Sequence, residues 1–515
     1  MKEIIAAIDV GSHALRMKIG EVNRSGEFKE LESFRKIAVL GHDTFTKGKI
    51  DFESVDQVCE LLKLFKRSFA DYGVSRYQAV GTSAIREASN RDYIVDQIMI
   101  KTGLDIRVIS NSEEQYLTHK AVKSHLKDYE RLINEGAIIV VVGAGSIQIT
   151  TYKDGRLQSS QNVKMGALRI REVFYDLEDR SLSFYKICDE YISSSLEDID
   201  LFKDGKVYQH LIAVGGEISV ITKIIEEQKG KESDVLTKKQ FGKLLEQVRG
   251  LSTEEIEERY QVKRGRAELI MPSMLLFKKF LEHVKSEVII TPQISLTDGI
   301  IQDLIKKGMH RDKPDKSMED IVTNAKVLAR KFDYNENHTD HVLQYATLLF
   351  DKLKAIHGME EERVLVQVAA ILHDIGKIVS LDKHYEHSYN IIRELEIFGL
   401  SQEQMEYVAL ISCFHSIQQP GEGFENYARQ PRNKKAMIAK LIAILRIADA
   451  LDRSHQGKIS LESVKIKEKK VVITGVSGVT TDTMLEEWAF AKKAAFFIEV
   501  FGITPILKMK RELLQ

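Results

Sequence analysis

The stretch Ala137–Gln148, AIIVVVGAGSIQ, constrains the fold of this chain more than any other. Its β-branched residues run into Gly143-Ala144-Gly145-Ser146 and an apolar segment then resumes, which predicts a buried strand, a tight turn and a second strand. Glycine allows the backbone N–H groups of such a turn to surround an anion. The same design recurs at Ile4–Ser12 and, more faintly, at Leu211–Gly216. Three strands that run into glycine predict one cleft lined by phosphate-sized loops.

With 515 residues the chain is too long for a single core, so we expect two to four domains. The formal net charge of -1 gives no overall attraction to nucleic acid or to an anionic membrane. Cys59, Cys188 and Cys413 lie far apart, show no metal-binding spacing and fit a reducing compartment. No apolar run approaches the roughly 20 residues that span a bilayer, and the first residues lack a signal-peptide layout. We therefore expect a cytoplasmic protein that binds neither nucleic acid nor membrane.

The periodicity of apolar residues divides the chain into five parts. Residues 1–125 alternate strand-like and helix-like segments, and residues 126–305 begin the same pattern again. This repetition predicts a duplicated α/β fold whose two lobes face each other across a cleft at the strand ends. Residues 306–317, charged and containing a proline, predict a linker. Long amphipathic helices then predict an all-α domain at 318–456, and returning strand signals predict a small α+β domain at 457–515.

Five motifs, in this order, resemble those of the exopolyphosphatase and guanosine pentaphosphate phosphohydrolase (Ppx/GppA) family. They are DVGSHALRM at Asp9–Met17, GTSAIREASN at Gly81–Asn90, VISNSEEQY at Val108–Tyr116, MGALRIREVF at Met165–Phe174, and Gly215-Gly216. The resemblance extends over essentially the whole chain. It implies an actin-like duplicated fold, hydrolysis of inorganic polyphosphate or guanosine pentaphosphate with Mg²⁺, and a homodimer.

The resemblance places the catalytic glutamate at Glu114, and the physical chemistry of phosphoanhydride cleavage agrees. The reaction needs donors and cations around the developing charge and a base that activates water. Asp9 at a strand end can orient a metal or its waters, and Arg86 can clamp phosphate oxygens with a bidentate guanidinium. Each has a structural alternative: a helix cap for Glu114, a turn residue for Asp9 and a salt bridge for Arg86. The expected phosphate-binding residues are Gly11, Ser12, Arg16, Gly143, Gly145, Ser146, Gly215 and Gly216.

The loops of the expected cleft depart from the family pattern at several positions. In the second loop Val141 stands where the family has an aspartate that helps hold Mg²⁺, and Gln148 stands where it has a glutamate. A hydrocarbon side chain cannot ligate a hard cation, which takes oxygen ligands. The other departures are His13-Ala14 for asparagine–serine, Glu217 for threonine and Gln302-Asp303 for arginine–glutamate. This pattern predicts a retained fold with a degenerate Mg²⁺ site and altered chemistry.

A second site is indicated by Val368–Lys377, VAAILHDIGK, which resembles the signature of HD-domain phosphohydrolases. The resemblance implies candidate metal ligands at His338, His373, Asp374, His387, His415 and Asp449. Imidazole nitrogens and carboxylates suit a divalent transition metal such as Mn, Fe or Zn. Four of these residues would hold one metal, whereas His387 and His415 would complete a two-metal site with Asp374 between the ions. The alternative for each histidine is a packed or surface residue, and Asp452 is expected to be helix-end structure.

Three functions remain open from the sequence. The first is a phosphoanhydride hydrolase that uses Glu114, Asp9 and Arg86 in the interlobe cleft. The second is an HD-type metal phosphohydrolase acting on a nucleotide or phosphate ester, with the front lobes as a sensor of a phosphorylated ligand. The third is a non-catalytic regulator that binds polyphosphate or a nucleotide. Val141 and Gln148 favour the second or the third, whereas Glu114, Asp9 and Arg86 favour the first, which is the leading interpretation.

Overall fold

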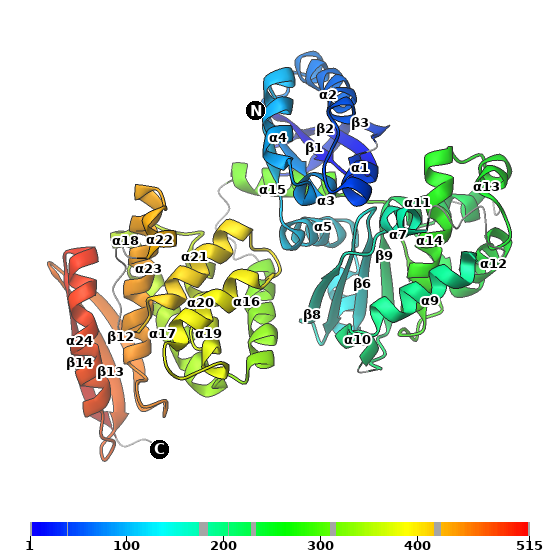
Figure 1. Cartoon of the computed structure of the whole chain (residues 1–515). Coiled ribbons are helices and arrows are strands. Elements are labelled where there is room, and N and C mark those ends of the chain that lie inside the picture. Colours follow the sequence, from blue (N-terminus) through cyan, green and yellow to red (C-terminus); the bar gives the residue numbers. More distant parts are fainter. Residues whose placement is uncertain are drawn as a thin grey trace. The chain divides into compact units, whose positions relative to one another are not determined.

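The computed structural model divides the chain into two compact units, Met1–Lys313 and Pro314–Gln515 (Figure 1). The structure describes residues 3–38, 40–174, 184–203, 205–227, 233–309, 316–416 and 424–512. Within these stretches, no helix is both long enough and apolar enough to cross a lipid bilayer.

The first lobe is built on a five-stranded sheet in the order β3-β2-β1-β4-β5. Its elements are β1 (Glu3–Val10), β2 (Ala14–Val22), β3 (Phe28–Ile37), α1 (Leu40–Lys47), α2 (Phe52–Tyr72), β4 (Arg76–Gly81), α3 (Ser83–Glu87), α4 (Arg91–Thr102), β5 (Ile106–Val108) and α5 (Asn111–His125). Strand β1 is apolar because both faces of the sheet are covered. Ala6 and Ile8 lie in the core that α2 and α4 cover. Ile5 and Ala7 lie in a second core on the opposite face.

The second lobe repeats the design with six strands in the order β10-β11-β9-β6-β7-β8. Its strands are β6 (Ala137–Val142), β7 (Ile147–Lys153), β8 (Arg156–Val163), β9 (His210–Val214), β10 (Val235–Thr237) and β11 (Val288–Ile290). Strands β6 and β7 pair antiparallel, and the Gly143 N–H donates to the Ser146 carbonyl at 2.9 Å. This confirms the strand, turn and strand predicted for Ala137–Gln148.

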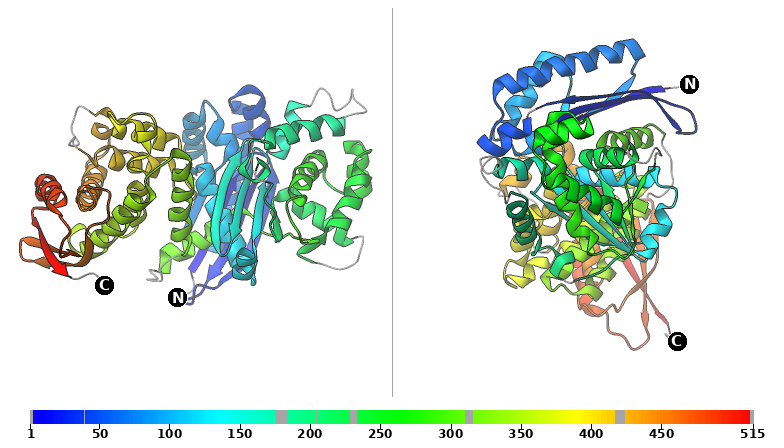
Figure 2. Two further views of the ribbon diagram at one scale, coloured as in Figure 1. Left: turned by 90° about the horizontal axis from the view of Figure 1, so that it is seen from below. Right: turned by 90° about the vertical axis from the view of Figure 1, so that its right-hand side faces the viewer.

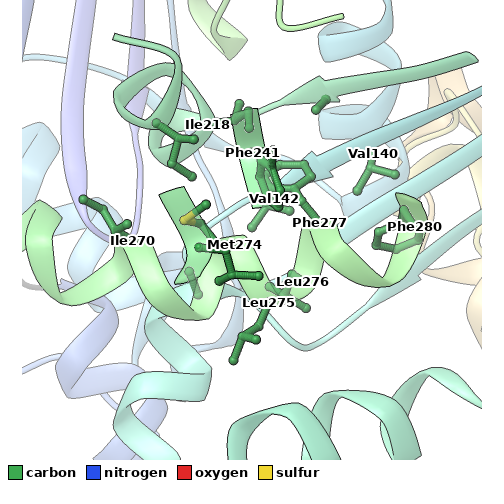
Figure 3. Packing of buried hydrophobic residues seen from close by; sticks show 14 of the residues in the cluster. Val140, Val142, Ile218, Phe241, Ile270, Met274, Leu275, Leu276, Phe277 and Phe280 are labelled. Carbon is green, nitrogen blue, oxygen red and sulfur yellow. The ribbon is translucent and has the colours of Figure 1, made fainter. Parts of the chain in front are cut away.

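The helices of the second lobe surround its main core. They are α6 (Tyr129–Glu135), α7 (Ala167–Val173), α9 (Phe184–Leu196), α10 (Asp200–Lys203), α11 (Gly216–Glu227), α12 (Lys238–Val248), α13 (Thr253–Tyr260) and α14 (Arg264–Leu281). Helices α11 and α14 pack on β6 and β9, and the green helices beside this sheet are visible in Figure 2. Figure 3 shows how Met274 and Phe277 of α14 approach Val142 of β6 in this core. The core therefore fixes the ends of β6 and β9, which carry two of the glycine turns.

The last helix of the first unit, α15 (Leu296–Met309), packs on the first lobe. Its apolar residues Ile300, Ile301 and Leu304 share a core with Ile5 and Ala7 of β1. The prediction that residues 126–305 form the second lobe is therefore wrong at its C-terminal end. Apolar spacing identifies the buried face of a helix but does not identify the sheet that covers it.

The predicted linker at 306–317 is shorter than expected. Residues 306–309 belong to α15, and α16 (Lys316–Ala329) begins at residue 316. Residues 310–315 lie outside the described residues. Charged residues are typical of a linker, but they also suit the exposed last turn of a helix.

Gly299 allows α15 to cross α5 at close range. A Cβ on Gly299 would lie 1.9 Å from the Leu117 carbonyl oxygen, so the helix must shift in Gly299→Ala. We expect this substitution to lower the free energy of unfolding by about 1–3 kcal/mol. Gly242→Ala in α12 is the matched control, because a Cβ there meets no atom within 4 Å. Alanine should stabilise that helix by about 0.5–1 kcal/mol. Denaturant unfolding measures both, and equal effects would contradict the proposed close contact.

The second unit contains both the helical domain and the C-terminal strands. Its helices are α16, η1 (Arg330–Phe332), α17 (Glu336–Lys352), α18 (Lys354–His357), α19 (Arg363–Leu372), η2 (Ile375–Ile378), α20 (His384–Glu394), α21 (Gln402–Cys413), α22 (Glu425–Ala428), α23 (Arg432–Ala450) and α24 (Met484–Phe501). The strands β12 (Ser460–Lys467), β13 (Lys470–Gly478) and β14 (Thr504–Glu512) form a separate sheet. Helix α24 packs on both β14 and α23. The segments predicted at 318–456 and 457–515 therefore form one compact unit and are not independent.

Candidate functional site

A hollow of about 380 Å³ lies between the two lobes of the first unit, where β1, β6 and β9 end. We call it the interlobe cleft, and all three predicted glycine turns line it. The residues that sequence analysis selected and that line the cleft are Asp9, Gly11, Ser12, Arg16, Glu114, Gly143, Gly145, Ser146, Gly215 and Gly216. Arg86 is absent from this lining.

The second and third turns pack closely against each other because the third is built from glycine. Gly215 has a φ of +143°, and a Cβ there would lie 2.3 Å from the Val142 carbonyl oxygen. Any larger residue would separate the third turn from the second. Gly216 is the first residue of α11, so the unpaired N–H groups of that helix begin at the cleft. Such a helix end favours negative charge.

Asp9 lies at the end of β1 and is 3% exposed. Its Oδ2 accepts from Arg16 Nη1 at 3.3 Å, whereas its Oδ1 is buried and has no hydrogen-bond partner. Burial raises the pKa of Asp9 to about 6; the Arg16 charge opposes this shift and Glu114 adds to it. The Asp9 carboxyl therefore carries a proton more readily than an exposed aspartate does.

Glu114 belongs to the first turn of α5, and its neighbour Glu113 makes the helix cap. Ser110 accepts from the Glu113 N–H, and the Glu113 carboxylate accepts from the Ser110 N–H at 3.2 Å. Glu113 therefore caps the helix, which was the alternative role proposed for Glu114. The Glu114 side chain, 19% exposed, is available to the cleft that it lines.

Arg86 holds Glu114 and does not line the interlobe cleft. Its Nη1 donates to Glu114 Oε2 at 3.1 Å and to the Ile109 carbonyl at 2.7 Å, and its Nη2 donates to Asn111. Arg86 therefore forms a salt bridge with Glu114, which was its expected structural alternative. Three hydrogen bonds at the start of α5 engage Arg86, and it does not line the cleft, so the structure does not support the expectation that it clamps phosphate. Arg86 orients the candidate base.

Two arginines that sequence analysis missed, Arg35 and Arg266, also line the cleft. Arg35 of β3 is paired in register with Arg16 of β2, which is itself paired with Asp9 of β1. This row across three strands becomes visible only when the register is known. Burial lowers the pKa of Arg266 to about 10, and the charge of Arg16 adds to the shift. Arg266 remains a cation at neutral pH.

The residues of the interlobe cleft do not fit a Mg²⁺ ion. Val141 lines the cleft and is paired across the ladder with Gln148, which is buried and is not part of the lining. Of the carboxylates in the lining, Asp9 has an Oδ1 atom without a hydrogen-bond partner, whereas Glu114 and Asp298 pair with Arg86 and Lys18. Three guanidinium groups share the same hollow. Mg²⁺ requires an octahedron of oxygen ligands, and nearby cations repel it. Another departure from the family pattern, Asp303, pairs with Lys120 at 2.8 Å outside the lining, so it joins α15 to α5.

In the second unit, five of the six predicted metal ligands form one buried cluster with His384. We call this set the histidine–aspartate cluster: His338, His373, Asp374, His384, His415 and Asp449. Asp374 lies at its centre: His373 Nε2 is 3.4 Å from Asp374 Oδ2, and His384 Nε2 is 3.4 Å from Asp374 Oδ1. His338 Nε2 lies 3.4 Å from Asp449 Oδ1. Two groups within it could each hold a metal ion, and they share Asp374.

The hydrogen bonds of the cluster leave its inner ring nitrogens available to a metal. His373 Nδ1 donates to the Ala370 carbonyl at 2.8 Å, and His415 Nδ1 donates to the Ser412 carbonyl at 2.6 Å. A carbonyl only accepts, so in the neutral ring the Nε2 atom carries the lone pair. His338 Nδ1 faces Asp452 at 2.9 Å, which orients that ring from behind. The Nε2 atoms of His338 and His373 are buried without a hydrogen-bond partner and face the Asp449 and Asp374 carboxylates at 3.4 Å. Imidazole nitrogens beside carboxylates are a donor set that a transition metal takes.

The prediction of His387 as a ligand is corrected to His384. Helix α20 begins at His384, whose ring reaches Asp374 and lies 3.4 Å from His415 Nε2. His387 is one helical turn further on, about 4.5 Å along the axis, and it belongs to neither candidate metal group among the described residues. Sequence analysis also missed His455, whose ring stacks on His338 at 3.7 Å.

Two lysines bind the carboxylates of the cluster. Lys377 contacts Asp374, and Lys493 of α24 contacts Oδ2 of Asp449. Burial opposes ionisation of Asp374, but His373 and neighbouring positive charges hold its pKa well below the usual range. Asp449 is likewise held ionised against burial, by Lys493 first. Both carboxylates are therefore charged, as metal ligands must be.

The fold and the glycine turns define a two-lobed α/β protein with a polar cleft between its lobes. The model of the Ppx/GppA phosphatase family matches residues 21–308, more than half of the chain, and the model of Ppx/GppA phosphatase domain III matches residues 322–493. The chain belongs to the Ppx/GppA phosphatase family. Membership in this family places it among the hydrolases.

Individual relatives support this family assignment at low sequence identity. A guanosine-5'-triphosphate,3'-diphosphate pyrophosphatase of Photobacterium profundum is 22% identical over 92% of this chain and 91% of its own length. A bifunctional 3-dehydroquinate synthase/phosphatase of Fusobacterium nucleatum is 22% identical over 59% of this chain, which spans 47% of that relative.

Solved structures share the fold of the first unit. The Ppx/GppA family member of Aquifex aeolicus is 22% identical, with a TM-score of 0.51 over 60% of this chain and 100% of its own. An exopolyphosphatase of Cytophaga hutchinsonii is 19% identical, with a TM-score of 0.55 over 59% of this chain and 98% of its own. These structures support the duplicated α/β fold.

Proposed function

We propose that the interlobe cleft hydrolyses phosphoanhydride bonds and releases the terminal phosphate of inorganic polyphosphate or guanosine pentaphosphate. The observation that carries the proposal is Glu114, which is relieved of capping by Glu113, oriented by Arg86 and exposed to the cleft. The substrate classes come from the names of the relatives and from the family motifs. The glycine turns and guanidinium groups are the donors that a chain of phosphates requires.

In this mechanism the Glu114 carboxylate accepts a proton from a water molecule. The water oxygen forms a bond to the terminal phosphorus while the bond from phosphorus to the bridging oxygen breaks. The shortened chain leaves with that bridging oxygen and its electron pair. Arg16 and the turns at Gly143 and Gly216 stabilise the charge that develops on the phosphoryl oxygens.

The activity is tested by phosphate release from polyphosphate and from guanosine pentaphosphate with the purified full-length protein. Turnover of either substrate supports a hydrolytic cleft, and their ratio assigns the preferred substrate. If the protein binds polyphosphate tightly but releases no phosphate, the third function, a non-catalytic regulator, replaces this proposal. The family resemblance also suggests a homodimer, which light scattering after size exclusion tests.

A second candidate function is an HD-type metal phosphohydrolase in the histidine–aspartate cluster, with the front lobes as a sensor. The Nε2 atoms of His338 and His373 favour it, because they are buried without a hydrogen-bond partner and face carboxylates. His338, His373 and Asp374, with Asp449 3.4 Å from His338, would hold one Mn, Fe or Zn ion, and Asp374, His384 and His415 would hold another. A bound metal would supply the activation of a water molecule at neutral pH. The substrate of this site would be a nucleotide or a phosphate ester.

A further inference from the structure

We infer that the interlobe cleft binds the terminal phosphates of its ligand without a divalent cation, and that Arg16, Arg35 and Arg266 supply the positive charge. This inference rests on the proposed function, because it takes the ligand to be a phosphate chain. Arg35 and Arg266 are added to the phosphate-binding residues expected from the sequence. Binding without metal differs from the Mg²⁺ dependence that the family resemblance implies.

The first step is the placement of Arg16 and Arg35. A Cβ on Gly216 would lie 3.0 Å from Arg16 Nη2 and 3.8 Å from Arg35 Nη2. Both guanidinium groups therefore lie against the first residue of α11. A phosphate at that helix end would meet two forked donors together with the positive end of the helix dipole.

The side chains that line the cleft carry more positive charge than negative charge. The acidic side chains of the lining are already engaged or buried: Asp9 pairs with Arg16, Asp298 pairs with Lys18 at 2.5 Å, and Glu114 pairs with Arg86. Glu217 is buried at the start of α11, and burial raises its pKa. Within the described part of the chain, no ion pair joins Arg35, Arg266 or Lys223 to an acidic side chain. This excess of positive charge attracts an anion to the cleft.

The cleft carries positive guanidinium groups where the family pattern has a negative carboxylate. Val141 lines the hollow where the family pattern has a carboxylate, and Arg35 and Arg266 place guanidinium groups in the same hollow. A dication would be repelled by these groups, whereas a polyphosphate end would be attracted. Arginine forms bidentate hydrogen bonds to phosphate oxygens, so it can neutralise and orient them directly.

The test measures binding of inorganic tripolyphosphate by calorimetry in buffer stripped of metals by a chelating resin, with and without added Mg²⁺. The full chain carrying Glu114→Gln is used so that the probe is not consumed. We expect binding without metal, and Mg²⁺ should improve the affinity less than threefold. Arg35→Met and Arg266→Met, added singly, should each weaken binding at least tenfold. Arg264→Met is the matched control, because Arg264 pairs with Glu254 at 2.8 Å outside the cleft.

Three results have distinct meanings. Binding that requires Mg²⁺ overturns the inference but preserves a phosphate cleft. Metal-free binding that Arg35→Met and Arg266→Met leave at the level of Arg264→Met also overturns it. No binding under either condition, with native unfolding midpoints, contradicts the proposed phosphate ligand itself.

Discussion

Glu114→Gln is expected to lower the turnover number for phosphate release from polyphosphate by a factor of about 10²–10⁴, the usual contribution of a general base. Glutamine has nearly the same shape as glutamate but cannot accept the proton of the attacking water. Arg86 remains in place through the Ile109 carbonyl and Asn111, so the start of α5 should keep its structure. Tripolyphosphate affinity should change little, because binding is assigned to other residues.

Glu113→Gln is the matched control for this prediction. It makes the same chemical change one residue earlier, at a side chain that caps α5 and pairs with Arg107 at 2.5 Å. We expect native turnover and a small loss in the free energy of unfolding, about 1 kcal/mol or less. Initial rates and denaturant midpoints of both variants provide the comparison. Equal turnover in the two variants would remove Glu114 from the reaction.

The double substitution His373→Ala/Asp374→Ala is expected to abolish the binding of a transition metal to the second unit. It removes a ligand from one candidate group and the carboxylate shared by both. Metal content by mass spectrometry should fall from about one or two ions per chain to near zero. Chelation of the native protein should lower its free energy of unfolding, by about 2.7 kcal/mol if the metal was present at 100 times its dissociation constant. The double variant should show no such response.

A closer comparison uses two histidines of α20. His384→Ala should weaken metal binding, because the His384 ring contacts Asp374 and His415. His387→Ala should leave the metal content unchanged. A metal-free native protein after supplementation with Mn, Fe and Zn would contradict the whole site. Loss of metal in His387→Ala but not in His384→Ala would restore the ligand set expected from the sequence.

The sequence predicts the core of the fold well because β-branched runs that end in glycine have few alternatives. Ala137–Gln148 forms the strand, turn and strand expected of it, and the two other glycine turns join it in one cleft. The assignment of α15 failed because a helical apolar face carries no information about its partner sheet. Tertiary packing decides that question, and Gly299 is the one local sign of a close crossing.

The site was predictable to the extent that it follows motifs. Two adjacent glutamates, Glu113 and Glu114, have different tasks that only the hydrogen bonds of the Ser110 cap distinguish. Arg35 lies in no motif, and its position in the cleft depends on strand register. His384 and His387 lie in one short segment, so the sequence alone does not distinguish them as ligands. The first residue of α20 determines which ring reaches Asp374.

We propose that phosphate release takes place in the interlobe cleft through Glu114. Phosphate release from polyphosphate, measured side by side for the native protein, Glu114→Gln and His373→Ala/Asp374→Ala, tests it most directly. We expect loss of turnover in Glu114→Gln and at least half of native turnover in the double variant. Loss of turnover in the double variant alone would contradict it and would assign the chemistry to the histidine–aspartate cluster.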